Sequence, residues 1–305
     1  MQPREDSASK SASCFYAPCI RPPHRGLERD SQWVRSAVAN ATLLAGCTRI
    51  YLDLGSNTGN VLRSLFEPEA FPRATLQPIF RQYFGQSGAE RRASVCAVAF
   101  EPNPLHMSRL ESIEERFRTQ GARLTVLTTT AASTADAHNV SFYPYPDGPK
   151  EAPAWGATLF KRPDGALNSR TSAVPVDTVD LTRWMSTVLD RAGTDSPTVI
   201  MKMDIEGAEF DVATRLLALG VLCRLRVLLV EFHAQPKKLS ARGVRGGTNV
   251  MRGGAFAEVY NWMVKRANSL GGCNVTLLPL EDALTSDAPL SSSRCSNIPR
   301  PLSCW

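Results

Sequence analysis

The sequence lacks any long hydrophobic run, and nowhere do its 305 residues approach the roughly 20 consecutive apolar residues that a membrane-spanning helix requires. Residues 1–30 have no apolar core between Arg4 and Arg29, so we expect no signal peptide in this sequence. The chain has only a small excess of positive charge. Its net charge of +6 is too weak by itself to indicate a nucleic-acid-binding protein. Internal repeats are absent as well. These absences favour a globular protein without a membrane span.

The sequence does contain enough apolar residues for a sizeable core, since 43% of them are hydrophobic over a length that suits one large α/β domain with appendages. Residues 1–30 are rich in Ser, Pro and Arg without periodicity, which predicts a disordered leader. The globular domain is expected over residues 31–280, with a first helix over 33–44. Residues 281–305 are expected to form a tail that contains Ser, Pro and Cys.

Eight cysteines are present, and their positions suggest two different roles. Cys96 and Cys223 lie in or beside predicted strands and are interpreted as small core residues. Disulfides in the Pro- and Ser-rich ends would indicate an oxidising compartment, and the cysteines there are Cys14, Cys19, Cys295 and Cys304. Three glycosylation sequons point the same way, and they begin at Asn40, Asn139 and Asn274. The cytoplasm is the default location, and the lumen of the secretory pathway is the alternative.

Strand-like and helical segments alternate along the chain, which predicts an α/β fold with a mostly parallel sheet. Apolar runs indicate strands near 49–54, 95–100, 124–128, 198–203 and 226–232. Further strands are expected at 140–143 and 275–280, the latter at a sheet edge. Helical spacing indicates helices at 59–66, 104–119, 178–190, 208–219 and 255–268.

Apolar positions within the predicted helices indicate which side chains are buried. Leu105 and Leu219 are assigned to buried stripes, and Trp184, Met185 and Trp262 to the core. Three stretches are predicted to be irregular, namely 67–93, 144–172 and 234–254. Long loops of this kind in a compact domain are usually functional or disordered.

A glycine turn follows the strand at 49–54 and reads Asp53-Leu54-Gly55-Ser56-Asn57-Thr58-Gly59. A dinucleotide-binding loop needs G-x-G-x-x-G so that its backbone can approach a pyrophosphate, and Asn57 stands where one of those glycines would be. A nicotinamide oxidoreductase is therefore disfavoured. The turn suits a ligand that has no phosphates but a positively charged amino-acid end, which Asp53 can bind through water or amide groups. S-adenosylmethionine is such a ligand, and the alternative is an ordinary strand-to-helix turn.

Acidic residues follow two later strands. Glu101 ends the strand at 95–100, where a carboxylate is positioned to accept both hydroxyls of a ribose. The alternative for Glu101 is a solvated acid beside two prolines. The strand at 198–203 runs into Lys202-Met203-Asp204-Ile205-Glu206-Gly207-Ala208-Glu209, at the strand end where open α/β sheets bind ligands.

With these motifs in order, the chain resembles the FkbM-type family of class I S-adenosylmethionine-dependent methyltransferases over residues 49–233. The resemblance rests on segments 50–59, 99–104, 130–133, 174–180, 202–209 and 231–233. Its most specific element is Asp204-Ile205-Glu206-Gly207-Ala208-Glu209. Ser56, where the family usually has Ala, and the long inserts depart from the family pattern.

The resemblance implies a Rossmann-like, doubly wound, mostly parallel seven-stranded sheet with helices on both faces. It also implies S-adenosylmethionine as the cofactor and methyl transfer to oxygen, typically to a hydroxyl of a small molecule or glycan. The implied cofactor-binding residues are Asp53, Gly55, Asn57, Gly59, Glu101, Ala131 and Asp204. The competing interpretation is a degenerate methyltransferase fold that acts as a binding module.

Methyl transfer to a hydroxyl needs a group that accepts the hydroxyl proton. The candidates follow the strands at 198–203 and 226–232, and they are Asp204, Glu206 and His233. Each has an alternative role: Asp204 in contacting the methionine amine of the cofactor, Glu206 at the helix terminus, and His233 as a structural residue. A divalent metal ion held by Asp204, Glu231 and His233 is a further alternative, although no metal is assigned from the sequence.

Residues 234–254 carry five basic residues and no acidic residue, and they follow the strand that ends near the predicted site. They predict a flexible lid that attracts an anionic acceptor, and the alternative is a solvated loop without a role. Nucleic acid is not expected as a partner because no aromatic residues interleave with the charges. The basic residues are Lys237, Lys238, Arg242, Arg245 and Arg252.

Overall fold

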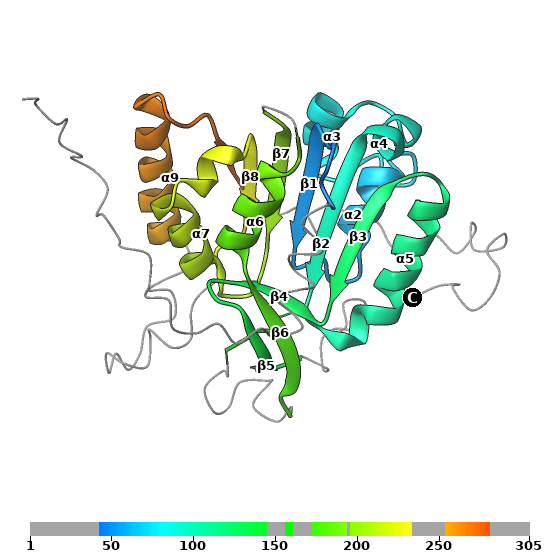
Figure 1. Cartoon of the computed structure of the whole chain (residues 1–305), viewed down its shortest axis with the longest axis horizontal. Helices are drawn as coiled ribbons and strands as arrows, with labels where there is room; N and C mark the ends of the chain where they lie inside the picture. The colour runs from blue at the N-terminus through cyan, green and yellow to red at the C-terminus, as the bar shows by residue number, and fades with distance from the viewer. Residues whose placement is uncertain (1–42, 145–155, 161–171, 194–195, 234–253, 281–305) are drawn as a thin grey trace, which may run out of the picture.

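The computed structural model describes residues 43–144, 156–160, 172–193, 196–233 and 254–280. Within these residues the main sheet has six parallel strands in the order β3-β2-β1-β7-β8-β9 (Figure 1). The strands lie close to their predicted positions, and their bounds are β1 Arg49–Leu54, β2 Val95–Glu101, β3 Arg123–Thr128, β7 Thr198–Met203, β8 Val227–Val230 and β9 Thr276–Pro279. The α/β class and the parallel main sheet are confirmed.

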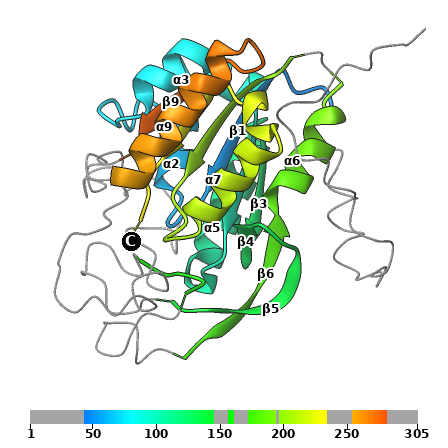
Figure 2. The same cartoon turned by 90° about the vertical axis from the view of Figure 1, so that its left-hand side faces the viewer.

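Helices cover both faces of the main sheet (Figures 1 and 2). Side chains alternate along β1, so that Ile50 and Leu52 join one core cluster and Tyr51 joins the other. Burial on both faces explains why the strands appear in the sequence as continuous apolar runs. The first cluster includes residues of α6 Leu181–Asp190, α7 Glu209–Ala218 and α9 Gly254–Ser269, and the second includes residues of α2 Asn60–Phe66, α3 Gln77–Phe84 and α5 Met107–Thr119.

The order of the strands reverses at β1. From β1 the chain continues to β2 and then β3 on one side, and it later places β7, β8 and β9 on the other side. The carboxyl ends of β1 and β7 are therefore neighbours from which connections leave in opposite directions. In open α/β sheets this switch point is where ligands bind.

A second sheet of three strands packs near the carboxyl ends of the main sheet, at the bottom of Figure 1. Its order is β4-β6-β5, with β4 Thr130–Ser133, β5 Ala137–Phe142 and β6 Val174–Asp180. The strand expected at 140–143 is thus part of a separate mixed sheet. In the described residues, six strands in one sheet and three in another replace the predicted single sheet of seven.

The prediction that residues 67–93 are irregular is wrong, because the segment contains α3 and α4 (Gly88–Ser94). The reason is the Arg91 side chain, which is fully buried and ties the segment together. Its Nη1 donates to the Leu65 carbonyl at 3.1 Å and to Gln77 Oε1 at 3.0 Å, while its Nε donates to the Gly85 carbonyl at 2.9 Å. Hydrophobic patterning places Arg on the surface, so it does not predict a segment that is held together by a buried arginine.

Three residues assigned to buried helix faces are exposed. Leu105 is 61% exposed because it belongs to a 3-10 turn, Pro104–His106, and α5 starts only at Met107. Leu219 is 49% exposed because α7 ends at Ala218. Trp262 is 66% exposed because α9 turns Tyr260 and Val264 toward the sheet instead. The core assignments of Trp184 and Met185 are confirmed.

The interpretation of Cys96 as a core residue is confirmed, whereas Cys223 is only half-buried, and both form disulfides that the sequence analysis did not assign to them. Cys47 bonds to Cys96, and Cys223 bonds to Cys273. The register of the sheet explains the first bridge, since Arg49 lies opposite Val95 and so brings the chain before β1 beside the start of β2. Both bridges lie at the amino ends of strands, and they are compatible with an oxidising compartment.

Several predictions concern residues outside those that the structure describes. They are the leader at 1–30, most of the helix at 33–44, most of the irregular stretch at 144–172, the four terminal cysteines, the tail at 281–305 and the basic segment up to residue 253. The domain boundaries therefore stay predictions. Among the helices that are described, none combines the length and the apolarity needed to cross a bilayer.

Candidate active site

The turn after β1 is held against the end of β2 by backbone hydrogen bonds. The amides of Gly55 and Ser56 both donate to the Phe100 carbonyl, at 3.0 and 3.2 Å. The turn then passes through left-handed conformations, with φ of 79° at Gly55, 50° at Asn57 and 78° at Gly59. This geometry points the Asn57 amide at the side chain that follows β2, which is Glu101.

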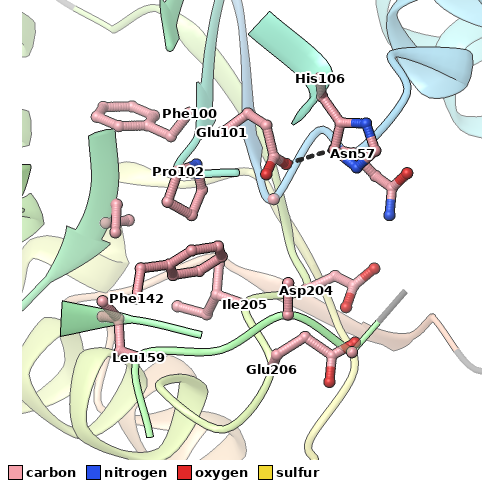
Figure 3. Close-up of a pocket in the computed structure, with 15 residues that line it drawn as sticks. Asn57, Phe100, Glu101, Pro102, His106, Phe142, Leu159, Asp204, Ile205 and Glu206 are labelled. Carbon is pink, nitrogen blue, oxygen red and sulfur yellow. Dashed lines mark hydrogen bonds between the residues drawn. The ribbon is translucent and has the colours of Figure 1, made fainter. Parts of the chain in front are cut away.

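Glu101 is a buried carboxylate fixed by two backbone amides. Asn57 N donates to its Oε2 at 2.6 Å (Figure 3), and Asn103 N donates to its Oε1 at 2.8 Å. Burial raises the pKa of Glu101 to about 7, and the two amides and Lys202 only partly oppose that shift. The carboxylate is therefore held rigidly at the edge of a pocket and titrates near neutral pH.

A pocket of about 580 Å³, counted with its open mouth, lies at the carboxyl ends of β1, β2 and β7 and beside β4 and β5. Glu101 and Pro102 lie on one side of it, opposite Phe142, Ile205 and Leu159 (Figure 3). Its mixture of apolar walls with a few polar groups is typical of a small-molecule site. Of the residues predicted from the sequence, it is lined by Gly55, Asn57, Glu101, Ala131, Asp204 and Glu206.

Three predicted site residues do not line this pocket. Asp53 is fully buried and faces Lys202, whose Nζ lies 3.4 Å from Asp53 Oδ1 and donates to the Gly55 carbonyl at 2.5 Å. Gly59 lies against α5 instead, since a Cβ there would meet Ile113 Cδ1 at 2.6 Å. His233 lies beside the pocket, beyond the turn after β7.

Lys202 is buried between two acids, Asp53 in β1 and Asp204 after β7. Its Nζ lies 3.6 Å from Asp204 Oδ2, and its side chain is 1% exposed. Burial lowers the pKa of Lys202, but the two carboxylates outweigh burial and the pKa is raised overall. Burial raises the pKa of Asp53, against the opposing effect of Lys202. The register of the sheet creates this pair, because Asp53 and Lys202 lie opposite each other.

Glu209, which begins α7, organises the turn after β7. Its side chain is fully buried, and it accepts the Ile205 amide on Oε1 and the Gly207 amide on Oε2, each at 2.8 Å. These bonds hold Glu206 in a left-handed conformation with φ of 53°. Glu209 therefore supports the turn and the helix start, while Glu206 and Asp204 line the pocket.

His233 is surrounded by carboxylates. Its Nδ1 lies 3.0 Å from Glu209 Oε1, and its Nε2 lies 3.3 Å from Glu231 Oε1. Glu206 Oε1 and Asp204 Oδ1 follow at 3.8 and 3.9 Å from the same Nε2. Burial lowers the pKa of His233, but Glu209, Glu231 and Glu206 outweigh burial and raise it to about 11.

His106 lines the pocket although no sequence motif singles it out. It belongs to the 3-10 turn after Glu101 and is 6% exposed, and its Nε2 has no hydrogen-bond partner among the described residues. Burial lowers its pKa to about 4, and Arg109 adds to that shift. A neutral imidazole therefore lies beside Glu101. A lone His in the segment Pro104-Leu105-His106 carries no pattern that would reveal this position.

The switch-point pocket, the glycine turn and the acid after β2 are features with which open α/β domains bind small ligands at the carboxyl edge of the sheet. The family model described as Methyltransferase FkbM domain matches residues 80–270. The chain therefore belongs to the FkbM methyltransferase domain family, as the sequence resemblance indicated, and it is a methyltransferase. Neither a search of curated proteins nor a search of solved structures found a match.

Proposed function

We propose that this chain is an S-adenosylmethionine-dependent O-methyltransferase that acts on a hydroxyl of a small molecule or glycan. The single observation that carries the proposal is the rigid Glu101 carboxylate at the edge of the switch-point pocket. S-adenosylmethionine, when bound, supplies a methyl group on a positively charged sulfur. The protein must hold that group in line with the acceptor and receive the acceptor proton.

The residues present fit this cofactor. Each oxygen of Glu101 accepts one backbone amide and retains capacity for a second hydrogen bond, which suits the two hydroxyls of a ribose. Pro102, Ala131 and Phe142 offer apolar surface on which an adenine ring would pack. Asp204 lines the same pocket and suits a positively charged amine. Gly55 lines the same pocket.

Calorimetric titration with S-adenosylmethionine and S-adenosylhomocysteine tests this assignment. Glu101→Gln keeps the size of the side chain but removes its charge, and we expect a loss of affinity of roughly 10- to 100-fold, the value of hydrogen bonds to a charged group. Glu111→Gln, at an exposed position of α5, is the matched control and should bind as the wild type does. Absence of binding to the wild-type protein at millimolar cofactor would overturn the proposal.

We infer that Asp204 and Glu206 are better placed than His233 to receive the acceptor proton. Both carboxylates line the pocket, whereas His233 lies behind them with Nδ1 on Glu209 and Nε2 toward Glu231. Glu206→Gln should lower the turnover number more than the cofactor affinity, whereas Asp204→Asn should lower both, because Asp204 also suits the amine of the cofactor. Asp211→Asn, at an exposed position of α7, is the control. A variant pair with unchanged turnover would refute this role.

The acceptor is found by a screen of hydroxylated sugars, lipids and polyketides with cofactor labelled in its methyl group. A labelled product with a methyl ether identifies O-methylation. The competing function, a binding module without catalysis, is supported instead if the cofactor binds but no acceptor is labelled by the protein under any condition of the screen.

A further inference from the structure

Four side chains with metal-binding atoms converge beside the cofactor pocket. Asp204 and Glu206 follow β7, while Glu231 and His233 follow β8, and the two strands are neighbours with Met203 opposite Val230. One ligand atom each of Asp204, Glu206 and His233 lies within 4.8 Å of the other two. The group combines imidazole nitrogen with carboxylate oxygen, a donor set that suits divalent metal ions.

The imidazole of His233 is oriented by a residue outside the group. Its Nδ1 lies 3.0 Å from Glu209 Oε1, and Glu209 is itself fully buried and fixed by two backbone amides. Nε2 is thereby turned toward Asp204, Glu206 and Glu231. Histidines that bind metals usually have their second nitrogen held by a carboxylate in this way, which fixes the tautomer and the ring.

The spacing of the atoms leaves room for an ion. With metal–ligand bonds of about 2.1 Å, neighbouring ligand atoms of an octahedron are about 3 Å apart and opposite ones about 4.2 Å apart. The three carboxylate oxygens lie 3.3, 3.8 and 3.9 Å from His233 Nε2. These separations fall within that interval, so a cation would need no large movement of the main chain.

Among the described residues, carboxylates outnumber basic groups in the ion pairs around this site. Lys202 pairs with Asp53 and Asp204, and His233 lies near the carboxylates of Asp204, Glu206, Glu209 and Glu231. Divalent cations take carboxylate oxygens of this kind as ligands. A cation bound at Nε2 would displace the proton there, since a histidine ligand is neutral.

We propose that Asp204, Glu206 and His233, with Glu231 beside them, bind one divalent cation at the border of the cofactor pocket. Asp204 and Glu206 belong to both the pocket and this cluster, so a cation here would lie next to the transferred methyl group. If the proposed O-methyl transfer is correct, it would hold the acceptor hydroxyl and favour loss of its proton. Binding of the cation itself does not rest on that function.

The test uses Mn²⁺, whose spectrum in electron paramagnetic resonance reports the free ion. We expect the full chain, stripped with chelator, to take up one Mn²⁺ and to unfold at a higher temperature with it than without it. His233→Gln and Glu206→Gln should each weaken uptake at least 10-fold, the lower end of what even indirect ligands contribute. Asp211→Asn on α7 should bind Mn²⁺ as the wild type does. Mg²⁺ and Zn²⁺ as competitors then rank the preferred ion.

Two results would overturn the cation site: no Mn²⁺ uptake by the wild type, or equal uptake by the wild type and His233→Gln. A variant of this region could fail to fold, so the folding of each variant is first checked by circular dichroism. Glu231→Gln provides an additional variant at a half-buried position. Cofactor binding is measured separately in chelator. Wild-type protein that binds the cofactor but no Mn²⁺ would refute only the cation site. Wild-type protein that binds Mn²⁺ but no cofactor would refute only the proposed function.

Discussion

Gly55 lies directly against the main-chain carbonyl of Asp204, so closely that a Cβ atom at position 55 would overlap that oxygen. The two residues directly follow neighbouring strands, β1 and β7, at the point where the strand order reverses. Position 55 therefore requires glycine for two reasons, because its backbone is left-handed and because no side chain fits there. This contact sets how closely the two strand ends approach, and so shapes one wall of the pocket.

Gly55→Ala should therefore push the two strand ends apart. Gly121→Ala is the matched control, because Gly121 has φ of 87° but a Cβ there would meet nothing within 4 Å. The control should lose about 1–2 kcal/mol of unfolding free energy, the strain of a left-handed residue. Gly55→Ala should lose more and should also lose cofactor affinity. If urea denaturation shows that Gly55→Ala and Gly121→Ala lose the same unfolding free energy, the overlap at position 55 does not destabilise the protein.

Cofactor affinity should rise as pH increases through about 7, the pKa to which burial raises Glu101. The ionised carboxylate accepts ribose hydroxyls, and it is the dominant form only above that pH. Lys202 and Asp53 are the charged groups that act on it, and the neutral His106 lines the same pocket. Calorimetry between pH 5.5 and 8.5, chosen as roughly the range that spans this pKa, measures the effect, which Glu101→Gln should abolish.

The same pKa shift predicts the opposite trend for the stability of the protein without cofactor. Between the ordinary value of 4.5 and about 7, folded Glu101 binds more protons than unfolded Glu101. The free energy of unfolding that this residue contributes therefore falls as pH rises through that window, by about 3 kcal/mol at most. Urea denaturation at pH 5 and pH 8, roughly the two sides of this window, should show a smaller decline for Glu101→Gln than for the wild type.

Lys202→Met should be strongly destabilising, because it leaves Asp53 buried without an opposite charge. Breaking a buried ion pair on one side typically costs about 3–5 kcal/mol. Asp53→Asn combined with Lys202→Met removes both charges and should recover part of that loss. Denaturant unfolding of the two variants decides the point. A double variant no more stable than the single one would show that the charge of Asp53 is not the cause.

Removing either disulfide should lower stability and leave cofactor binding intact. Cys47 and Cys96 are separated by 49 residues, and Cys223 and Cys273 by 50. Loops of this length predict a loss of about 4 kcal/mol for each bridge. Paired Ala substitutions, compared by thermal unfolding and calorimetry, test both expectations. A reduced affinity in folded protein would show that the bridges also shape the pocket.

The strands of the main sheet and the polar residues that follow them could be predicted from the sequence, whereas β4 and β6 were not. Continuous apolar runs mark strands buried on two faces, and in a parallel sheet their carboxyl ends meet at one edge, which is why Glu101, Asp204 and Glu206 could be identified. The direction of Asp53 could not be predicted. It depends on the register that sets β1 against β7 and turns this side chain toward Lys202.

What the sequence did not reveal depends on contacts between distant segments. The disulfides require the pairing of β1 with β2 and of β8 with β9. The α3–α4 segment is supported by Arg91, a residue type that patterns place on the surface. The site at His106 arises only because a short 3-10 turn rotates that side chain inward while Leu105 faces out. None of these three features can be recognised from a short stretch of the sequence.

The two disulfides fasten the main sheet at the amino ends of its strands, whereas the pocket lies at the opposite edge. For protein engineering this separation is useful. Loops at the pocket edge can be exchanged to redirect the enzyme to other acceptors, while the fastened edge keeps neighbouring strands aligned. Such variants should be produced in a host that forms disulfides. In a reducing host the two bridges would not form, and the protein would lose the stability that lets it accept exchanged loops.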